Sequence, residues 1–238
     1  MTVQLFIPCF IDQLFPQTAF NMVKVLEKAG VDVKYNEEQT CCGQPAFNAG
    51  FRDEARDVCS KFLKDFSGSD FVVAPSASCV GFVKNYYSTL FNNSSVHNEV
   101  RDLGKRTYEF SSFLVNVLRI EDFGATLHGK ATYHDSCAGL RECRIKDEPR
   151  KLLSRVKGLE LLEMNDVETC CGFGGSFAVK FESISVAMAD QKVNNALATG
   201  ADYIISTDLS CLMHLDGYIK HKGHPIRTMH IADVLANT

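Results

Sequence analysis

The chain has 238 residues, 45% of them hydrophobic, a size and composition that suit one large domain or two small ones. Its 25 basic and 29 acidic residues give a net charge of −4 and form no run of like charges, so we expect no nucleic-acid or anionic-membrane partner. The chain has no apolar stretch long enough to span a bilayer, and its first residues lack the features of a secretory leader. We therefore expect a cytoplasmic protein without a membrane span.

The apolar pattern predicts strands that alternate with helices along the whole chain. Short apolar runs typical of buried strands occur at residues 3–7, 31–35, 71–74, 131–133, 159–162 and 203–205. Apolar residues at helical spacing occur at residues 18–29, 51–66 and 184–199. Strands connected by crossover helices form parallel sheets, so we expect an α/β fold.

The second half of the chain repeats the first. Offsets of 128, 129 and 132 residues pair Cys9 with Cys137, Cys41-Cys42 with Cys170-Cys171, and Cys79 with Cys211. Residues 106–114 match residues 227–235 in the same way, after a shorter segment in the second copy. This duplication predicts two tandem, pseudo-symmetric, Rossmann-like domains, residues 1–122 and 123–238, which join within residues 121–126.

Each copy places its cysteines in the same order relative to the predicted strands. In each copy, 31 or 32 residues separate the first Cys from a Cys-Cys pair, and a further 36 or 39 residues separate the pair from a last Cys. Single cysteines follow the first and third strands, and the pair follows the second. The carboxyl ends of parallel strands share one edge of the sheet, where ligands bind in such folds. We therefore expect four thiols to meet at that edge in each copy.

Four converging thiols indicate a soft metal centre. Thiolate sulfur selects iron–sulfur clusters, zinc or copper(I). A structural zinc site usually includes a Cys-x-x-Cys pair, which this sequence lacks, and two adjacent cysteines bind a multi-iron cluster more readily than one ion. The glycine after each pair would also let backbone N–H groups approach the sulfur atoms.

At these residues the chain resembles the cysteine-rich CCG-domain proteins. This family includes the B subunit of heterodisulfide reductase and iron–sulfur subunits of glycolate and glycerol-3-phosphate oxidation systems. The similarity extends over essentially the whole chain and is strongest to a branch concerned with lactate utilisation. The segments that carry it are CCGQPA at 41–46, PSASC at 75–79, YHDSC at 133–137, CCGFGG at 170–175 and MHIA at 229–232.

The resemblance implies a cytoplasmic iron–sulfur subunit that oxidises L-lactate to pyruvate together with two partner proteins. At least one of these partners would be an electron-transfer iron–sulfur protein of the lactate-utilisation system. The resemblance also implies that the centres are iron–sulfur clusters, [4Fe-4S] in one or both halves, with zinc as an alternative in one site. The implied ligands are Cys9, Cys41, Cys42, Cys79, Cys137, Cys170, Cys171 and Cys211.

The chain departs from one ligand pattern of the family. In heterodisulfide reductase B subunits, the last cysteine of the motif belongs to a Cys-x-x-Cys pair that helps to hold a non-cubane cluster. Here the second position of that pair is Phe82 in the first half and His214 in the second. A ring nitrogen of His214 is therefore a candidate replacement ligand, as histidine is in Rieske centres. A non-cubane cluster, a cubane cluster and zinc all remain open for these sites.

Several other residues have two interpretations each. His134 and Asp135 are candidates for proton transfer or for contacts to the ligands, and equally for capping the end of a strand. Cys59 lies on an apolar helical stripe, so we expect a buried structural residue away from the sheet edge. Cys143 lies in a charged stretch and is not expected to bind the second centre.

Two other classes of function fit the same cysteines. One is a zinc-stabilised scaffold that holds partners together without redox chemistry. The other is a thiol–disulfide enzyme that uses the adjacent cysteine pairs, whose disulfide would be strained and easily reduced. A nicotinamide site is not expected, because residues 172–177 do not fit a dinucleotide-binding fingerprint.

Overall fold

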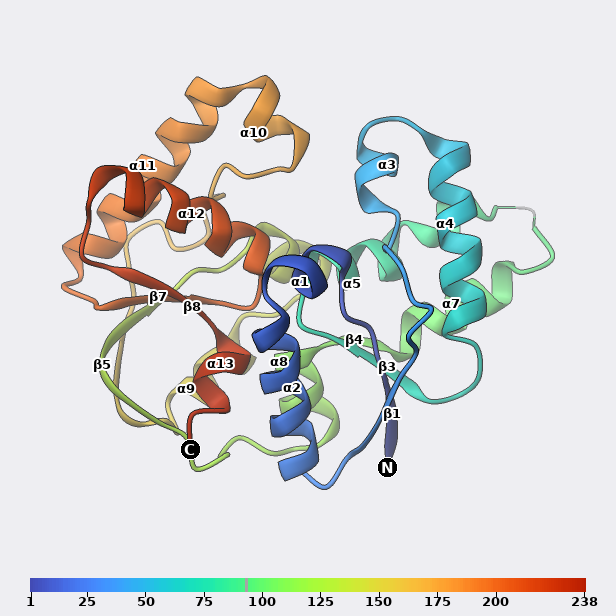
Figure 1. The fold of residues 1–238 in the computed structure, drawn as a ribbon, viewed down its shortest axis with the longest axis horizontal. Helices are drawn as coiled ribbons and strands as arrows, with labels where there is room; N and C mark the ends of the chain where they lie inside the picture. The colour runs from blue at the N-terminus through green and yellow to red at the C-terminus, as the bar shows by residue number, and fades with distance from the viewer. Residues whose placement is uncertain (93) are drawn as a thin grey trace.

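A computed structural model of the chain describes residues 1–92 and 94–238. It contains two four-stranded sheets in which every pair of neighbouring strands is parallel, so the predicted α/β fold with two parallel sheets is confirmed (Figure 1). The first sheet has the order β2 (Asp32–Tyr35), β1 (Thr2–Leu5), β3 (Phe71–Ala74), β4 (Thr107–Glu109). The second has the order β6 (Lys157–Leu162), β5 (Thr126–Tyr133), β7 (Tyr203–Ser206), β8 (Arg227–His230).

The helices connect the strands within each half. Those of the first half are α1 (Cys9–Leu14), α2 (Pro16–Lys28), α3 (Gln44–Asn48), α4 (Arg52–Asp65), α5 (Ala77–Asn85), α6 (Tyr87–Leu90), α7 (His97–Arg106) and α8 (Phe110–Ser112), which continues into the π-helical turn η1 (Phe113–Val117). Those of the second half are the π-helical turn η2 (Ala138–Glu142), α9 (Asp147–Leu153), α10 (Ser176–Lys180), α11 (Glu182–Ala198), α12 (Leu209–Lys222) and α13 (Ile231–Leu235). The first half alone inserts α6 and α7 before its last strand, which accounts for the shorter segment in the second copy.

The strands of the two halves superpose in register. Leu5 pairs with Val73 in the first sheet as Tyr133 pairs with Ile205 in the second. The amide of the following residue then donates to the carbonyl oxygen of that partner in each half. Phe6 donates to Val73 over 3.0 Å, and His134 donates to Ile205 over 2.8 Å. The duplication seen in the sequence is therefore a duplication of the backbone.

The fourth strand of each sheet was missed. Residues 107–109 and 227–230 match between the copies, but they contain threonine, glutamate, arginine and histidine instead of an apolar run. They lie at one edge of each sheet, where a strand has only one neighbour and needs fewer apolar side chains. A second difference is that β1 ends at Leu5, two residues early, because the Ile7 amide donates to the Gln39 side chain over 2.8 Å instead of to the sheet.

One hydrophobic core joins the two halves. It contains side chains of β1, α2 and η1 from the first half and of β7, α12 and α13 from the second. The last helix, α13, packs on α2 near the start of the chain (Figure 1). Asp233 of α13 accepts hydrogen bonds from Thr18 over 3.0 Å and from Asn21 over 2.9 Å. A smaller core, rich in phenylalanine, lies between α4, α5 and α7 of the first half.

The boundary between residues 122 and 123 stays a prediction. It falls between the last helical residue of the first half, Val117, and the first strand residue of the second, Thr126. In residues 1–92 and 94–238, no helix is both long enough and apolar enough to cross a bilayer.

Candidate metal centre

The structure brings the predicted cysteines into two groups. The first thiol group consists of Cys9, Cys41, Cys42 and Cys79, and the second thiol group of Cys137, Cys170, Cys171 and Cys211. In each half, one member lies just after the central strand, the adjacent pair lies in the loop after an edge strand, and the last member lies in the first turn of α5 or α12. The thiols therefore meet at the carboxyl edges of the strands. All ten cysteines of the chain are free thiols.

The central thiol of each group is the one stabilised as an anion. Hydrogen bonds from Cys42 and Cys9 lower the pKa of Cys41 to about 3. Hydrogen bonds from Cys137 and Cys171 lower the pKa of Cys170 to about 2. The backbone amide two residues later in the chain donates a further hydrogen bond to each of these sulfur atoms. Gly43 N–H lies 3.3 Å from Cys41 Sγ, and Gly172 N–H lies 3.4 Å from Cys170 Sγ.

The neighbouring thiols show the opposite shift. The pKa values of Cys9, Cys42, Cys137 and Cys171 are raised, first because each donates to the central thiolate and then because of burial and the adjacent negative charge. Several thiols crowded together thus share very few negative charges. A bound cation would reverse this balance and let more of them ionise, which is the behaviour of a metal-ligand set.

The glycine after each pair is required by the packing of the loop. Gly43 and Gly172 have φ of 91° and 93°, a region that L side chains rarely adopt. A Cβ on Gly172 would lie 2.6 Å from the Ser185 carbonyl oxygen of α11, and one on Gly43 would lie 3.3 Å from the Ala55 carbonyl oxygen of α4. Glycine therefore lets each cysteine pair lie directly against the following helix.

His134 lies with the second thiol group. One of its ring nitrogens and the sulfur atoms of Cys171 and Cys211 all lie within 4.8 Å of one another. The side chain is fully buried, and among the described residues neither ring nitrogen has a hydrogen-bond partner. Burial, followed by the charge of Lys192, lowers the pKa of His134 to about 3, so the ring is neutral.

Asp135 does not pair with His134. Its buried carboxylate accepts two hydrogen bonds from Arg150, at 3.0 and 2.9 Å, and Arg150 in turn binds Glu163. The two residues proposed from the sequence as a proton-handling pair thus have separate surroundings. His134 is near the thiols, whereas Asp135 fixes the guanidinium of α9.

His214 has a polar partner of its own. Its Nε2 lies 3.2 Å from Ser185 Oγ, which also donates to the Gly172 carbonyl oxygen over 2.8 Å. His214 therefore supports the loop that follows Cys171. Its role as a cluster ligand stays a prediction.

Of the two remaining cysteines, Cys59 was partly misplaced by the sequence analysis. It is fully buried on α4 as expected, but it is not away from the sheet edge, because its thiol lies 3.6 Å from the Cys42 carbonyl oxygen. The loop of the cysteine pair folds back onto α4, which the helical pattern alone does not indicate. Cys143 lies against the first half, with its thiol 3.3 Å from the Ala77 carbonyl oxygen.

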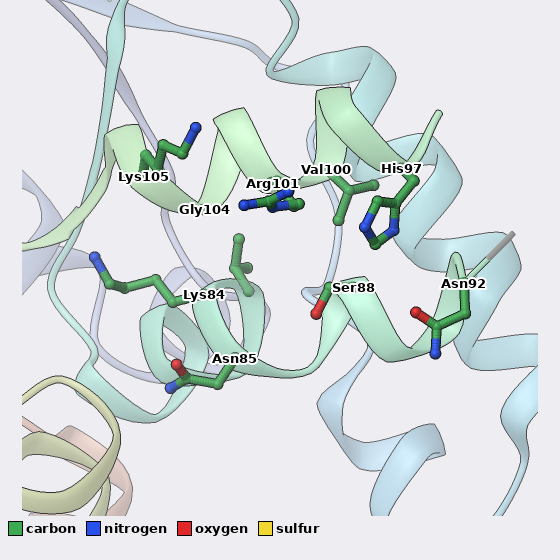
Figure 2. Close-up of a pocket in the computed structure, with 10 residues that line it drawn as sticks. Lys84, Asn85, Ser88, Asn92, His97, Val100, Arg101, Gly104 and Lys105 are labelled. Carbon is green, nitrogen blue, oxygen red and sulfur yellow. The ribbon is translucent and has the colours of Figure 1, made fainter. Parts of the chain in front are cut away.

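A separate cavity of about 460 Å³ lies between α5 and α7, the second of which is present only in the first half (Figure 2). Basic side chains from both helices line it, and its described lining includes no cysteine. The labelled lining residues are Lys84, Asn85, Ser88, Asn92, His97, Val100, Arg101, Gly104 and Lys105. The thiol groups, and not this cavity, hold the residues suited to metal chemistry.

Sequence reasoning missed Lys192 and Asp208. Lys192 is 1% exposed, and its ammonium donates to the carbonyl oxygens of Asp166 at 2.6 Å and Val167 at 3.1 Å, just before the second cysteine pair. Asp208 is a buried carboxylate that accepts from the Ser78 amide of the other half over 2.9 Å. The signal available in the sequence for Lys192 was a lysine at the repeat position that Phe62 occupies in the first half.

The donor set suits a metal or iron–sulfur centre. Each half offers four thiols with N–H groups directed at sulfur, and the second half adds a buried imidazole without a partner. A family model described as a cysteine-rich domain, CCG, matches residues 3–84 and 131–216, one match in each half. The chain belongs to the cysteine-rich CCG-domain family. The resemblance noted in the sequence is thereby confirmed.

Relatives with nearly the same length carry one name. A lactate utilization protein A of Geobacillus kaustophilus is 44% identical over 99% of this chain and 98% of its own length. A lactate utilization protein A 2 of Bacillus cereus is 43% identical over the same shares of the two chains. Among solved structures, a hypothetical protein from Helicobacter pylori matches 98% of this chain with a TM-score of 0.58 and 12% identity. This chain spans 48% of that protein, and the likeness shows the fold alone.

Proposed function

We propose that this protein is an iron–sulfur subunit of a multi-protein system that oxidises L-lactate to pyruvate. The observation that carries the proposal is the pair of four-thiol groups at equivalent sheet edges, in a chain whose full-length relatives are named for lactate utilization. Oxidation of a 2-hydroxy acid to a 2-keto acid releases two electrons and two protons. Iron–sulfur clusters, when bound, supply one-electron carriers for such a reaction.

The chain's own residues would bind and shield these clusters. The eight cysteines of the two thiol groups would be the ligands. The cluster would be of the [4Fe-4S] type in at least one half. The amides of Gly43 and Gly172 already donate to sulfur, an interaction that tunes cluster potentials in other proteins. Cys42 and Cys171 are 2% and 1% exposed, so the inner part of each site excludes water.

The electrons must pass to an acceptor, and we propose two partner proteins, at least one of them an electron-transfer iron–sulfur protein. We also propose a cytoplasmic location. The tagged protein can be purified from its source cells grown on lactate, and identification of the proteins that co-purify with it tests the partners directly.

Metal analysis of anaerobically purified protein tests the cofactor. We expect about four irons and four acid-labile sulfides for each occupied half, a brown colour, and an EPR signal after reduction. Tightly bound zinc in colourless protein would instead support the zinc-stabilised scaffold. A loss of two protons by mass at Cys41-Cys42 or Cys170-Cys171 on mild oxidation would support the thiol–disulfide reading.

A matched pair of variants tests the ligand assignment. Cys171→Ser removes a proposed ligand and should abolish most of the iron bound by the second half. Cys59→Ala is the control, because Cys59 packs against the first cysteine pair but corresponds to Ala189 in the repeat, so alanine is accepted at this position. Equal loss of iron in the two variants would contradict the assignment.

A further inference from the structure

The two thiol groups occupy equivalent positions but have different surroundings. Phe6 and His134 are equivalent, since their amides donate to Val73 and Ile205 in the same register. In the first half, Phe6 packs edge-on against Phe62 of α4, with ring centroids 4.7 Å apart. Both rings belong to the same buried cluster as Cys42 and Cys79 of the first thiol group.

The second half replaces this aromatic pair with two nitrogen-bearing side chains. Gly43 approaches Ala55 of α4 as Gly172 approaches Ser185 of α11, which aligns the two helices with an offset of 130 residues. The same offset places Lys192 at the position of Phe62. His134 and Lys192 therefore stand where the first half has Phe6 and Phe62. A polar environment in one copy alone indicates a difference in what the two sites bind.

The missing partner of His134 shows what that difference is. A buried imidazole without a hydrogen bond lowers the stability of a fold, and here both ring nitrogens lack a partner among the described residues. Lys192 does not satisfy them, because its ammonium binds the Asp166 and Val167 carbonyl oxygens. What lies beside the ring is sulfur, from Cys171 and Cys211.

The geometry is that of ligands around a metal. Metal–sulfur bonds of about 2.3 Å and metal–nitrogen bonds of about 2.0 Å place neighbouring donor atoms roughly 3–4 Å apart. The three donor atoms of His134, Cys171 and Cys211 lie within 4.8 Å of one another, so a single metal centre can contact all three. His214, in contrast, has Ser185 as its partner.

We propose that a ring nitrogen of His134 is a ligand of the metal centre in the second half. That centre then has a mixed sulfur and nitrogen ligand set, whereas the first centre is held by thiolates alone. Imidazole nitrogen and thiolate differ in charge, and the identity of the ligands is one of the factors that set the reduction potential of a cluster. The duplicated halves are therefore expected to hold centres of unequal potential. This inference rests on the proposed function, because it requires a metal centre at the second thiol group.

The test is pulsed EPR of the anaerobically purified, reduced protein. Wild-type protein should show the hyperfine coupling of a directly bound nitrogen, and labelling of the histidines with ¹⁵N should change that coupling. His134→Phe, which copies Phe6 of the first half, should lose the coupling, whereas His214→Phe, which copies Phe82, should keep it. If His134→Phe does not fold, His134→Gln serves in its place, and the isotope experiment needs no variant.

The possible results separate this inference from the function on which it rests. Protein that contains iron and sulfide but shows no histidine nitrogen coupling would overturn the ligand role of His134 and leave the proposed function intact. Coupling that survives in both His134 variants would overturn it as well. Protein that takes up neither iron nor sulfide under anaerobic reconstitution would overturn both proposals.

Discussion

Gly172 lies where the loop after Cys171 comes closest to α11. We expect Gly172→Ala to lower the free energy of unfolding by roughly 1–3 kcal/mol more than Gly200→Ala. Both glycines have positive φ, but a Cβ on Gly172 would meet the Ser185 carbonyl oxygen at 2.6 Å, whereas one on Gly200 has no neighbour within 4 Å. Urea denaturation of the metal-free variants measures the difference. Equal effects would mean that the close approach is unimportant.

The histidine next to the second thiol group predicts a pH dependence of the metal-free protein. Burial lowers the pKa of His134 to about 3 in the folded chain, from an ordinary value of 6.5. The unfolded chain therefore takes up a proton below pH 6.5 that the folded chain refuses, and stability falls with decreasing pH by up to about 1.4 kcal/mol per pH unit. This contribution is fully present above the unfolded pKa.

Removal of the imidazole should remove this dependence. Between about pH 7.5 and pH 5.5, wild-type protein should lose about 1 kcal/mol more stability than His134→Phe. Denaturation curves at the two pH values, on metal-free protein, supply the comparison. An identical loss in both proteins would show that His134 is protonated in the folded state as well.

For single residues, the sequence predicted the positions of the cysteines well and the positions of their neighbours poorly. All eight patterned cysteines lie at the predicted edges, because strand order and spacing determine where the carboxyl ends meet. The contact of Cys59 with Cys42, and the contacts of Lys192 with the residues before the second cysteine pair, depend on how α4 and α11 dock onto the loops. Such docking is a property of tertiary packing that no local pattern contains.

The start of α12 connects the two thiol groups. Asp208, just before this helix, accepts hydrogen bonds from the Ser78 amide at 2.9 Å and from Ser210 Oγ at 2.9 Å. Ser78 and Ser210 directly precede Cys79 and Cys211. Burial raises the pKa of the Asp208 carboxyl, while the bonds to Ser210 and Ser78 act in the opposite direction. A single carboxylate therefore orients the first turns of α5 and α12 together.

Loss of that carboxylate should affect both helices. We expect Asp208→Ala to lower the free energy of unfolding by about 2–3 kcal/mol, because it leaves the Ser78 amide without its partner. Asp216→Ala, on the same helix, removes only a surface ion pair with Lys220 and should cost less than about 1 kcal/mol. Thermal unfolding of the two variants measures this. Similar midpoints would argue against a bridging role for Asp208.

The elements themselves were predictable in proportion to their apolar content. Strands such as β3 and β7 are mostly buried and contain two adjacent valines or isoleucines, and the sequence pattern located both within one residue. The edge strands β4 and β8 were recognised as a repeated segment but not as strands, since half or more of their residues are polar. Helices α6 and α7 have no counterpart in the second half, so the repeat offered no guide to them.

The molecule as a whole is duplicated in topology but not divided in its core. Side chains from both halves form one cluster around β1, α2, β7 and α13. The buried carboxylate of Glu109 also accepts a hydrogen bond from Thr207 of the other half. The family match to two separate segments, residues 3–84 and 131–216, therefore describes the evolutionary unit and not a unit that is closed in space.

Separated halves should accordingly fail to fold alone. We expect residues 1–122, expressed without the rest, to lack the cooperative unfolding transition of the full chain, because α2 would expose the surface that α13 covers. Co-expression of residues 1–122 with 123–238 should restore the transition. Circular dichroism during thermal unfolding measures both, and a cooperative transition in the isolated first half would contradict this expectation.

The packing of α13 on α2 also determines the order in which parts of the protein can fold during synthesis. Asp233 receives the hydrogen bonds of Thr18 and Asn21, yet more than two hundred residues separate these partners along the chain. Since the ribosome conceals the newest part of a nascent chain, α2 must stay uncovered until α13 has been synthesised and has left the exit tunnel. The cysteines of the first thiol group are synthesised well before α13, so the core that supports them is completed only when the second half of the chain has emerged.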